Sequence, residues 1–319
     1  MMTQSHYFEP NANRPVVGRF APSPTGRMHA GNIYAALSAW LVAKSQGGTI
    51  VLRIEDLDRD RSKAEYISAV QRDFELLGLT WDHGPFFQHD RDEAYLEAFS
   101  ALERRGLVYP CFCTRADLHA ASAPHRGEKF VYPGTCRGLT AEQIAENSMR
   151  RVPAQRLRVP DDTYSFEDMV QGRYKQNLAH DCGDFLIRRS DQAFAYQLAV
   201  VVDDAAQGVT SIVRGVDLLC STPQQLYLQE LLGLDHPRYA HIPLLVAEKN
   251  RRLSKRDHDA GIEELLARFK TPAAIIGHIA GICGLAPTCD PATPEQLLAT
   301  FDVARLPELF SDPVQIPWR

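Results

Sequence analysis

The stretch "RFAPSPTGRMHAGN" (residues 19–32) lies where a predicted strand passes into a predicted helix. An apolar lead of Val16 and Val17 precedes it, residues 16–21 predict a strand, and two prolines then stiffen the turn. Apolar side chains recur at helical spacing over residues 30–46, and two glycines follow as a stop signal. A histidine therefore stands directly before a long helix.

The glycines of this stretch match neither of the two commonest nucleotide loops, G-x-G-x-x-G and G-x-x-x-x-G-K-[ST]. A helix N-terminus is nevertheless an anion site, because its free N–H groups and its dipole favour phosphate. His29 and Asn32 lie at the helix start, and Gly31 allows a ligand to approach the backbone. These three residues are phosphate-site candidates; the alternative is a capped helix with an incidental histidine.

Strands and helices alternate after this stretch. Residues 49–56 (TIVLRIED) are rich in β-branched side chains and predict a buried strand, and residues 91–105 predict a helix. Ser62 and Glu65 have the spacing of a capping box at the start of another helix. The order predicts an α/β fold with a doubly wound parallel sheet, followed from residue 263 by a helical C-terminal segment.

The bulk composition narrows the class of protein. The chain has 319 residues, 45% of them hydrophobic, which suits about two globular domains. No apolar run approaches the roughly 20 residues of a membrane span, so we expect a cytoplasmic protein with no membrane partner. Its net charge of −5 gives no overall attraction to nucleic acid. An RNA site would need a local basic patch, for which "RRVPAQRLR" (150–158) and "LIRR" (186–189) are candidates.

A second basic loop, "RRLSKRD" (251–257), follows the apolar run "IPLLVA" (242–247). Taken alone it is most simply an ordinary solvated run of charges.

Taken together, the opening stretch and this basic loop resemble two signature motifs of a known enzyme family. "PSPTGRMHAGN" resembles the HIGH signature of class I aminoacyl-tRNA synthetases, and "RLSKR" resembles their KMSKS loop. The strings "RFAPSPTG" and "RIEDLDRDR" resemble the glutamyl and glutaminyl branch, and the similarity runs over residues 16–259.

The resemblance implies a Rossmann-like catalytic domain that uses Mg-ATP as a substrate. It implies an ATP site made by His29, Gly31, Asn32, Ser254 and Lys255. Asn32 stands where the second histidine of HIGH is expected, and arginines replace the first lysine and the last serine of KMSKS. We therefore expect stabilisation of the transferring phosphoryl group to rest on His29 and Lys255 as the catalytic residues.

A glutamate substrate brings two carboxylates and one ammonium group, so its pocket needs fixed cations and one anion. Arg19 and Arg214 suit planar carboxylate recognition, Glu55 can take the ammonium group, and Tyr196 can add a hydroxyl. Each of these alone could be a structural ion pair or a core aromatic. The resemblance supports a glutamate pocket made by Arg19, Phe20, Ala21, Pro22, Ser23, Glu55, Tyr196 and Arg214.

Three of the seven cysteines, Cys111, Cys113 and Cys136, fall within one loop-rich segment. A structural zinc site needs four ligands, and chemistry alone nominates His119 or His125 for the fourth place. The resemblance instead suggests Tyr132, because "CFC…YPGTC" resembles the Cys, Cys, Tyr, Cys set of one glutamyl synthetase-like group. We expect one structural zinc ion; three free thiols in a reducing compartment are the alternative.

The expected organisation divides a Rossmann-like catalytic domain into residues 1–110 and 183–246. Residues 111–182 form a zinc-bearing insertion, and residues 247–319 form the KMSKS-like loop and a helical segment. Only 63 residues follow Arg256, whereas an anticodon-binding domain needs on the order of 100. We therefore expect no anticodon-binding domain.

A short, zinc-bearing chain of this kind resembles the glutamyl-queuosine tRNA(Asp) synthetases. That resemblance implies activation of L-glutamate with ATP without tRNA, followed by transfer to queuosine in the anticodon of tRNA(Asp). The main alternative is a truncated glutamyl-tRNA synthetase that charges a tRNA 3′ end. An adenylate-forming nucleotidyltransferase without an RNA partner and a non-catalytic RNA-binding paralogue are further alternatives.

Overall fold

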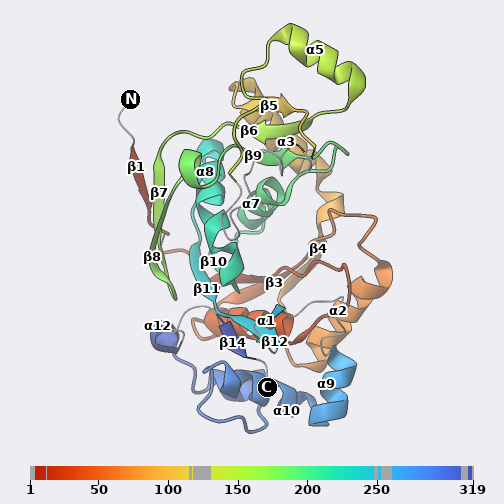
Figure 1. Cartoon of the computed structure of the whole chain (residues 1–319). Coiled ribbons are helices and arrows are strands. Elements are labelled where there is room, and N and C mark those ends of the chain that lie inside the picture. Colours follow the sequence, from red (N-terminus) through yellow and green to blue (C-terminus); the bar gives the residue numbers. More distant parts are fainter. Residues whose placement is uncertain are drawn as a thin grey trace.

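The structure is a computed structural model that describes residues 4–11, 13–114, 117, 131–247, 251–252, 261–309 and 315–317. Its centre is a parallel sheet in two parts (Figure 1). One part contains β2 (Val17–Phe20), β3 (Thr49–Ile54) and β4 (His83–Phe87). The other contains β10 (Ser211–Gly215), β11 (Arg238–Ile242), β7 (Thr163–Asp168) and β1 (Ser5–Phe8). The predicted α/β fold with a parallel sheet is confirmed.

The two parts of the sheet meet where β2 lies beside β10. The backbone amide of Thr210 donates to the carbonyl of Val17 at 2.9 Å, and the amide of Val17 donates to the Thr210 hydroxyl at 2.9 Å. This junction joins the first and second halves of the chain. The carboxyl ends of β2, β3 and β10 consequently open on the same edge.

Each face of the sheet carries its own hydrophobic core. Side chains of a strand alternate between faces, so Ile212 and Val213 of β10 enter different cores, as do Tyr239 and Ala240 of β11. The core that contains Val213 also holds helix α1 (Ala30–Lys44), whose residues are buried almost all round. The core that contains Ile212 includes side chains from α3 (Asp92–Arg104), α7 (Tyr196–Ala206) and α8 (Thr222–Leu232). Helices on both faces make the sheet doubly wound.

The predicted capping box at Ser62 and Glu65 is wrong. Helix α2 (Ala64–Leu76) begins after Lys63, which makes no side-chain cap hydrogen bond. The amide of Ser62 donates instead to the carbonyl of Asp58 at 2.9 Å. Ser62 therefore ends a tight turn rather than capping the helix.

A small antiparallel sheet, β5 (Val108–Cys111), β6 (Ala154–Leu157) and β9 (Phe185–Arg188), carries the segment that contains the clustered cysteines. Helix α5 (Ala141–Arg150) projects from this region at the top of Figure 1, and none of its residues is buried. The hairpin of β7 and β8 (Gly172–Asn177) lies within the span expected to be an insertion, yet β7 pairs with β1 and β11 of the central sheet.

The C-terminal part packs beneath α1 (Figure 1). Its core elements are α9 (Ile262–Phe269), α10 (Pro272–Ile282) and α11 (Pro294–Leu298). A three-stranded sheet joins β12 (Leu244–Ala247), β13 (Arg251–Arg252) and β14 (Gln315–Pro317).

The remaining short elements lie along the whole chain: α6 (Leu178–Asp181), α12 (Leu306–Leu309), η1 (Gln88–Asp90), η2 (Val216–Ser221) and η4 (Val303–Arg305). Among the described residues, no helix has the length and apolar character needed to cross a membrane.

We predict that Gly277→Ala destabilises this C-terminal part. A Cβ atom at Gly277 of α10 would lie 1.9 Å from the carbonyl oxygen of Asp290, a backbone atom that has no rotamer with which to yield. The free energy of unfolding should fall by about 2 kcal/mol, as over-packed sites do. Gly138→Ala is the matched control, because no described atom lies within 4 Å of its Cβ position. Equal stability of the two variants in urea unfolding would contradict the close packing of α10.

Candidate active site

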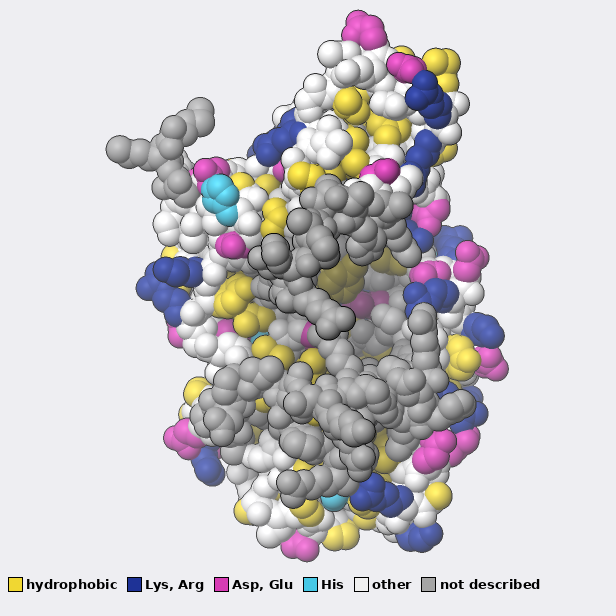
Figure 2. Space-filling view, in the orientation of Figure 1, with side chains coloured by type: hydrophobic (Ala, Val, Ile, Leu, Met, Phe, Trp, Pro, Cys, Tyr) yellow, Lys and Arg dark blue, Asp and Glu magenta, His cyan; other side chains and the backbone are white. Residues whose placement is uncertain are grey.

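A cavity of about 470 Å³ opens at the carboxyl ends of β2, β3 and β10. Figure 2 shows a molecular face that is hollowed near its middle, with hydrophobic side chains in the hollow. All eight residues expected to form a glutamate pocket line the cavity, together with Asn32 and several apolar side chains from α1 and α2. The eight are Arg19, Phe20, Ala21, Pro22, Ser23, Glu55, Tyr196 and Arg214.

Arg214, at the end of β10, is 5% exposed and is held by neutral groups. Its Nη2 donates to Thr222 Oγ1 and to Gln225 Oε1, each at 2.8 Å, and its Nη1 lies 3.4 Å from the Tyr196 hydroxyl. Within the described residues, no carboxylate pairs with this guanidinium. A buried cation without an anionic partner is costly. The arrangement therefore suits a ligand that brings its own carboxylate.

His241 of β11 completes the surroundings of Arg214. The Nε of Arg214 donates to His241 Nε2 at 3.0 Å, and His241 Nδ1 lies 2.5 Å from Asp168 Oδ2. Burial lowers the pKa of His241, although Asp168 acts in the opposite direction. The pKa of Asp168 is lowered despite its burial, because His241 and backbone amides donate to its carboxylate.

Arg19 lies at the end of β2 and is also 5% exposed, but it has an acidic neighbour. Its Nε lies 3.3 Å from Asp204 Oδ1, and its Nη1 donates to the carbonyl of Val213. The same Asp204 oxygen accepts a hydrogen bond from Arg53 Nη1 at 2.7 Å. Asp204 of α7 thus connects the arginines of two neighbouring strands.

Glu55, the candidate anion, lies just beyond β3 with its side chain 11% exposed. Arg53 Nη2 donates to its Oε1 at 3.1 Å. Burial raises the pKa of Glu55, and Arg53 and Arg19 oppose that shift. Burial works to lower the pKa of Arg53, but Asp204, Glu55 and Asp203 outweigh it, so this pKa is raised. Arg53 therefore stays charged and fixes the carboxylate of Glu55 at the rim of the cavity.

A second cavity of about 300 Å³ adjoins the first and shares Asn32, Ala35 and Gly215 with it. His29 and Gly31 line it at the start of α1. His29 caps this helix: its Nδ1 accepts from the amide of Gly31 at 3.1 Å, and its own amide donates to Asn32 Oδ1 at 3.1 Å. The first three phosphate-site candidates thus lie together, whereas Ser254 and Lys255 lie outside the described residues.

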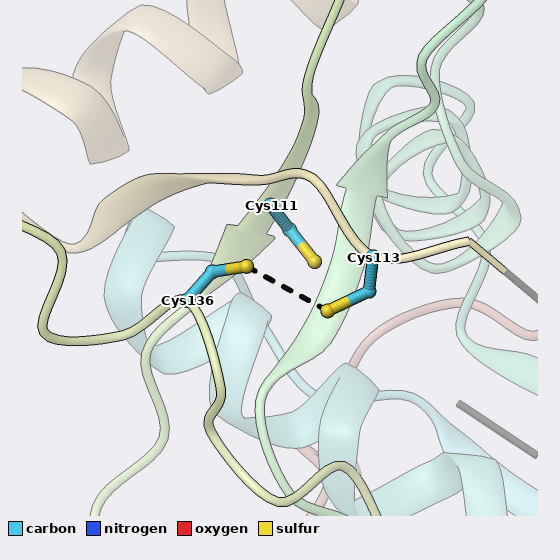
Figure 3. Close-up of side chains that lie close together, drawn as sticks. All are labelled: Cys111, Cys113 and Cys136. Atoms are coloured by element: carbon cyan, nitrogen blue, oxygen red, sulfur yellow. Dashed lines mark hydrogen bonds between the residues drawn. The ribbon is translucent and has the colours of Figure 1, made fainter. Parts of the chain in front are cut away.

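The three clustered cysteines also come together (Figure 3). The Sγ atoms of Cys111, Cys113 and Cys136 all lie within 4.8 Å of one another, and those of Cys113 and Cys136 are 3.6 Å apart. The Tyr132 hydroxyl lies 3.5 Å from Cys111 Sγ and 3.8 Å from Cys113 Sγ. Thiolates around a tetrahedral zinc ion stand about 3.8 Å apart, so this donor set could hold a metal ion. His119 and His125, the other candidates for the fourth place, lie outside the described residues.

Arg156 is a partner of this cluster that the sequence did not reveal. It belongs to the basic run considered as an RNA surface, but it is buried. Its Nε donates to Cys111 Sγ at 3.2 Å, and its guanidinium carbon lies 3.6 Å from the centre of the Tyr132 ring. Burial would raise the pKa of Cys111, but Arg156 and Tyr132 outweigh it and lower this pKa.

Sequence reasoning also missed Arg53, Asp168, His241 and Asp204 around the first cavity. Arg53 had a signal, since it is a charged residue inside the apolar run "TIVLRI". Asp168 and His241 had none, because they lie 73 residues apart in the sequence and meet only when β7 and β11 pair.

Comparison with known proteins gives the family. Residues 15–283 match the family model for the catalytic domain of class I tRNA synthetases (E and Q). A glutamate tRNA ligase from Elizabethkingia meningosepticum, solved in complex with its amino acid, superposes with a TM-score of 0.79 at 25% identity. The superposition covers 95% of this chain and 67% of that chain.

Curated proteins match more closely in sequence. The glutamyl-Q tRNA(Asp) synthetase of Symbiobacterium thermophilum is 43% identical in an alignment of 314 positions that covers 94% of this chain and 95% of that protein. The protein of the same name from Nitratidesulfovibrio vulgaris is 44% identical in an alignment of 301 positions that covers 91% of this chain and 93% of that protein. The chain therefore belongs to the class I tRNA synthetases of the E and Q type and, within them, to the glutamyl-Q tRNA(Asp) synthetase family.

Proposed function

We propose that this chain activates L-glutamate with ATP to glutamyl-adenylate and transfers the glutamate to queuosine in the anticodon of tRNA(Asp). The similarity to glutamyl-Q tRNA(Asp) synthetases over more than nine-tenths of the chain carries the proposal. Membership of the class I family makes the chain an ATP-dependent ligase. The cavity at the strand ends supplies a substrate site with the charges that glutamate requires.

In this proposal, Arg214 and Arg19 bind the two carboxylates of glutamate and Glu55 binds its ammonium group. The buried, neutral surroundings of Arg214 support its part, because a substrate carboxylate would supply the missing anion. The location of Glu55 at the rim of the cavity supports its assignment to the ammonium group. Tyr196 adds a hydroxyl beside Nη1 of the Arg214 guanidinium.

In the activation step, glutamate in the first cavity reacts with ATP in the second. A substrate carboxylate oxygen attacks the α-phosphorus of Mg-ATP, the bond to the β-phosphate bridge breaks, and pyrophosphate leaves. We assign the ATP site to His29, Gly31, Asn32, Ser254 and Lys255. The amides at the start of α1 favour phosphate, and His29 and Lys255 stabilise the charge that develops on the transferring group.

Transfer completes the reaction. A hydroxyl of the cyclopentene cis-diol of queuosine attacks the carbonyl of the mixed anhydride, AMP leaves, and an ester forms. We propose that exposed arginines of the antiparallel region contact phosphates of the anticodon loop. Arg137, Arg150 and Arg151 are exposed there, and Figure 2 shows basic side chains on both edges of this upper part. The buried Arg156 is excluded from this surface.

We propose that the cysteine cluster binds one structural zinc ion through Cys111, Cys113, Tyr132 and Cys136. The separations between these donors and the burial of Cys111 and Cys136 support it. Zinc there would stabilise a region with few apolar side chains and would take no part in the chemistry. We also place the protein in the cytoplasm, where ATP and tRNA meet.

The alternative, a truncated glutamyl-tRNA synthetase, is not favoured. The curated relatives that match along nine-tenths or more of their own length are glutamyl-Q tRNA(Asp) synthetases at 40–44% identity. The solved glutamate tRNA ligases match at 25% identity over about two thirds of their length.

The acceptor provides the first test. Labelled glutamate should move onto tRNA(Asp) that contains queuosine and not onto the same tRNA with unmodified guanine, which lacks the cis-diol. The ester should survive removal of the 3′-terminal adenosine. Charging that is lost after this trimming, or efficient charging of tRNA(Glu), would establish the truncated glutamyl-tRNA synthetase instead.

Replacing Arg214 tests the amino-acid site. Arg214→Gln should lower glutamate activation on the order of 100-fold and reduce the preference for glutamate over glutamine, because the charge-assisted pair is lost. Steady-state pyrophosphate exchange with each amino acid measures both effects. Arg173→Gln, at an exposed arginine of β8, is the control. An unchanged preference in the Arg214 variant would remove this residue from the pocket.

Metal content tests the cysteine cluster. Plasma mass spectrometry should find one zinc per chain, and Cys111→Ser should lose it, whereas Cys289→Ser at an exposed cysteine should keep it. Tyr132→Phe should release zinc to a chelator faster than wild type does. If that variant holds zinc as wild type does and His119→Ala or His125→Ala releases it, a histidine is the fourth ligand. A zinc-free wild-type chain of normal thermal stability would support three free thiols.

A further inference from the structure

His241 lies behind Arg214 on the neighbouring strand. The parallel register of β10 and β11 pairs Arg214 directly with His241, so both side chains emerge on the same face of the sheet. The His241 side chain is fully buried and is absent from the lining of the cavity. It can therefore act on a ligand in the cavity only through the residues that it contacts.

The hydrogen bonds determine where the proton of this imidazole lies. A guanidinium can only donate, so His241 Nε2 must accept from Arg214 Nε. The proton is consequently on Nδ1, which donates to Asp168 at 2.5 Å. Asp168 is itself fixed, because it accepts from the backbone amides of Val170, Gln171 and His241.

This neutral imidazole has two consequences for Arg214. With Nε bound by His241 and Nη2 bound by Thr222 and Gln225, the plane of the guanidinium is locked. Nη1, which has the Tyr196 hydroxyl as a loose neighbour at 3.4 Å, is the donor left for a ligand. The carboxylate of Asp168 is held one imidazole away, so it orients Arg214 without neutralising it at contact distance.

We propose that His241, anchored by Asp168, is a positioning residue that orients Arg214 and thereby determines the selectivity of the site for glutamate over glutamine. This inference rests on the proposed glutamate-activating function. It assigns a task to the buried His241, which lies outside the cavity lining; Asp168 fixes the tautomer of the imidazole, a constraint that an amide acceptor in the same place does not need.

Two substitutions separate the contacts of the two ring nitrogens of His241, of which Nε2 also accepts from the Thr222 hydroxyl at 3.2 Å. The amide of Gln reaches the place of Nε2, so His241→Gln keeps an acceptor for Arg214 and loses the contact with Asp168. The amide of Asn reaches the place of Nδ1, so His241→Asn keeps the contact with Asp168 and leaves Arg214 Nε without its acceptor. His236→Asn is the matched control, because His236 contacts Gln229 and Phe8 and does not line the cavity.

The experiment is pyrophosphate exchange with each variant, with glutamate, glutamine and ATP varied in turn. His241→Asn should raise KM for glutamate about 10-fold and lower the glutamate-to-glutamine ratio of kcat/KM by a similar factor, with KM for ATP unchanged. His241→Gln should stay within about 3-fold of wild type in both quantities, although it loses thermal stability. His236→Asn should match wild type in KM and in the ratio.

A His241→Asn chain with the glutamate KM and amino-acid ratio of wild type would overturn the inference. So would equal increases in KM for glutamate and ATP in both variants, which would indicate a purely structural role. If His241→Asn does not fold, His241→Gln decides alone: a 10-fold rise in its KM for glutamate contradicts the inference. A wild-type chain without glutamate-dependent exchange would contradict the function itself, and the inference with it.

Discussion

The buried ion pair of Arg53 and Asp204 joins the two halves of the chain at the active site. Arg53 lies in β3 and Asp204 in α7, 151 residues later, and their atoms approach to 2.7 Å. From this pair, Arg53 reaches Glu55 and Asp204 reaches Arg19, so one contact orients two residues of the cavity. Removing one partner of such a pair leaves an uncompensated buried charge, at a cost of about 3–5 kcal/mol. The positions of Glu55 and Arg19 at the cavity thus depend on the ion pair that links β3 to α7.

The arginines around the cavity fall into two groups. Arg53 and Arg19 have acidic partners, and their charges are balanced within the protein. Arg214 has only neutral hydrogen-bond partners among the described residues, and the nearby Asp168 is separated from it by His241. A site that balances some charges and leaves another to the ligand selects substrates by charge, because a neutral ligand leaves that cation buried and unpaired. In the proposed function, the neutral surroundings of Arg214 leave its charge to be paired by the substrate carboxylate.

Local patterns in the sequence predicted most of the framework. The apolar runs of β2 and β3 and the helical spacing of α1 act over a few residues, so they can be recognised directly. The eight pocket residues were expected from the family resemblance and not from local patterns, and all of them line one cavity. The cap at Ser62 was wrong because a turn from Asp58 competes for the same residues. The partnership of His241 with Asp168, and that of Arg156 with the cysteines, depend on strand pairing between distant segments that no local pattern encodes.

In the proposed function, the cavities at the strand ends bind glutamate and ATP together, and the two substrates react there without RNA. Exchange of labelled pyrophosphate into ATP, measured with purified protein and no tRNA, tests it most directly. The arrangement of Arg19, Glu55 and Arg214 around a preformed cavity predicts exchange that depends on L-glutamate, with no more than slight stimulation by glutamine. Exchange that starts only when tRNA is added, or that proceeds equally with glutamine, would contradict it.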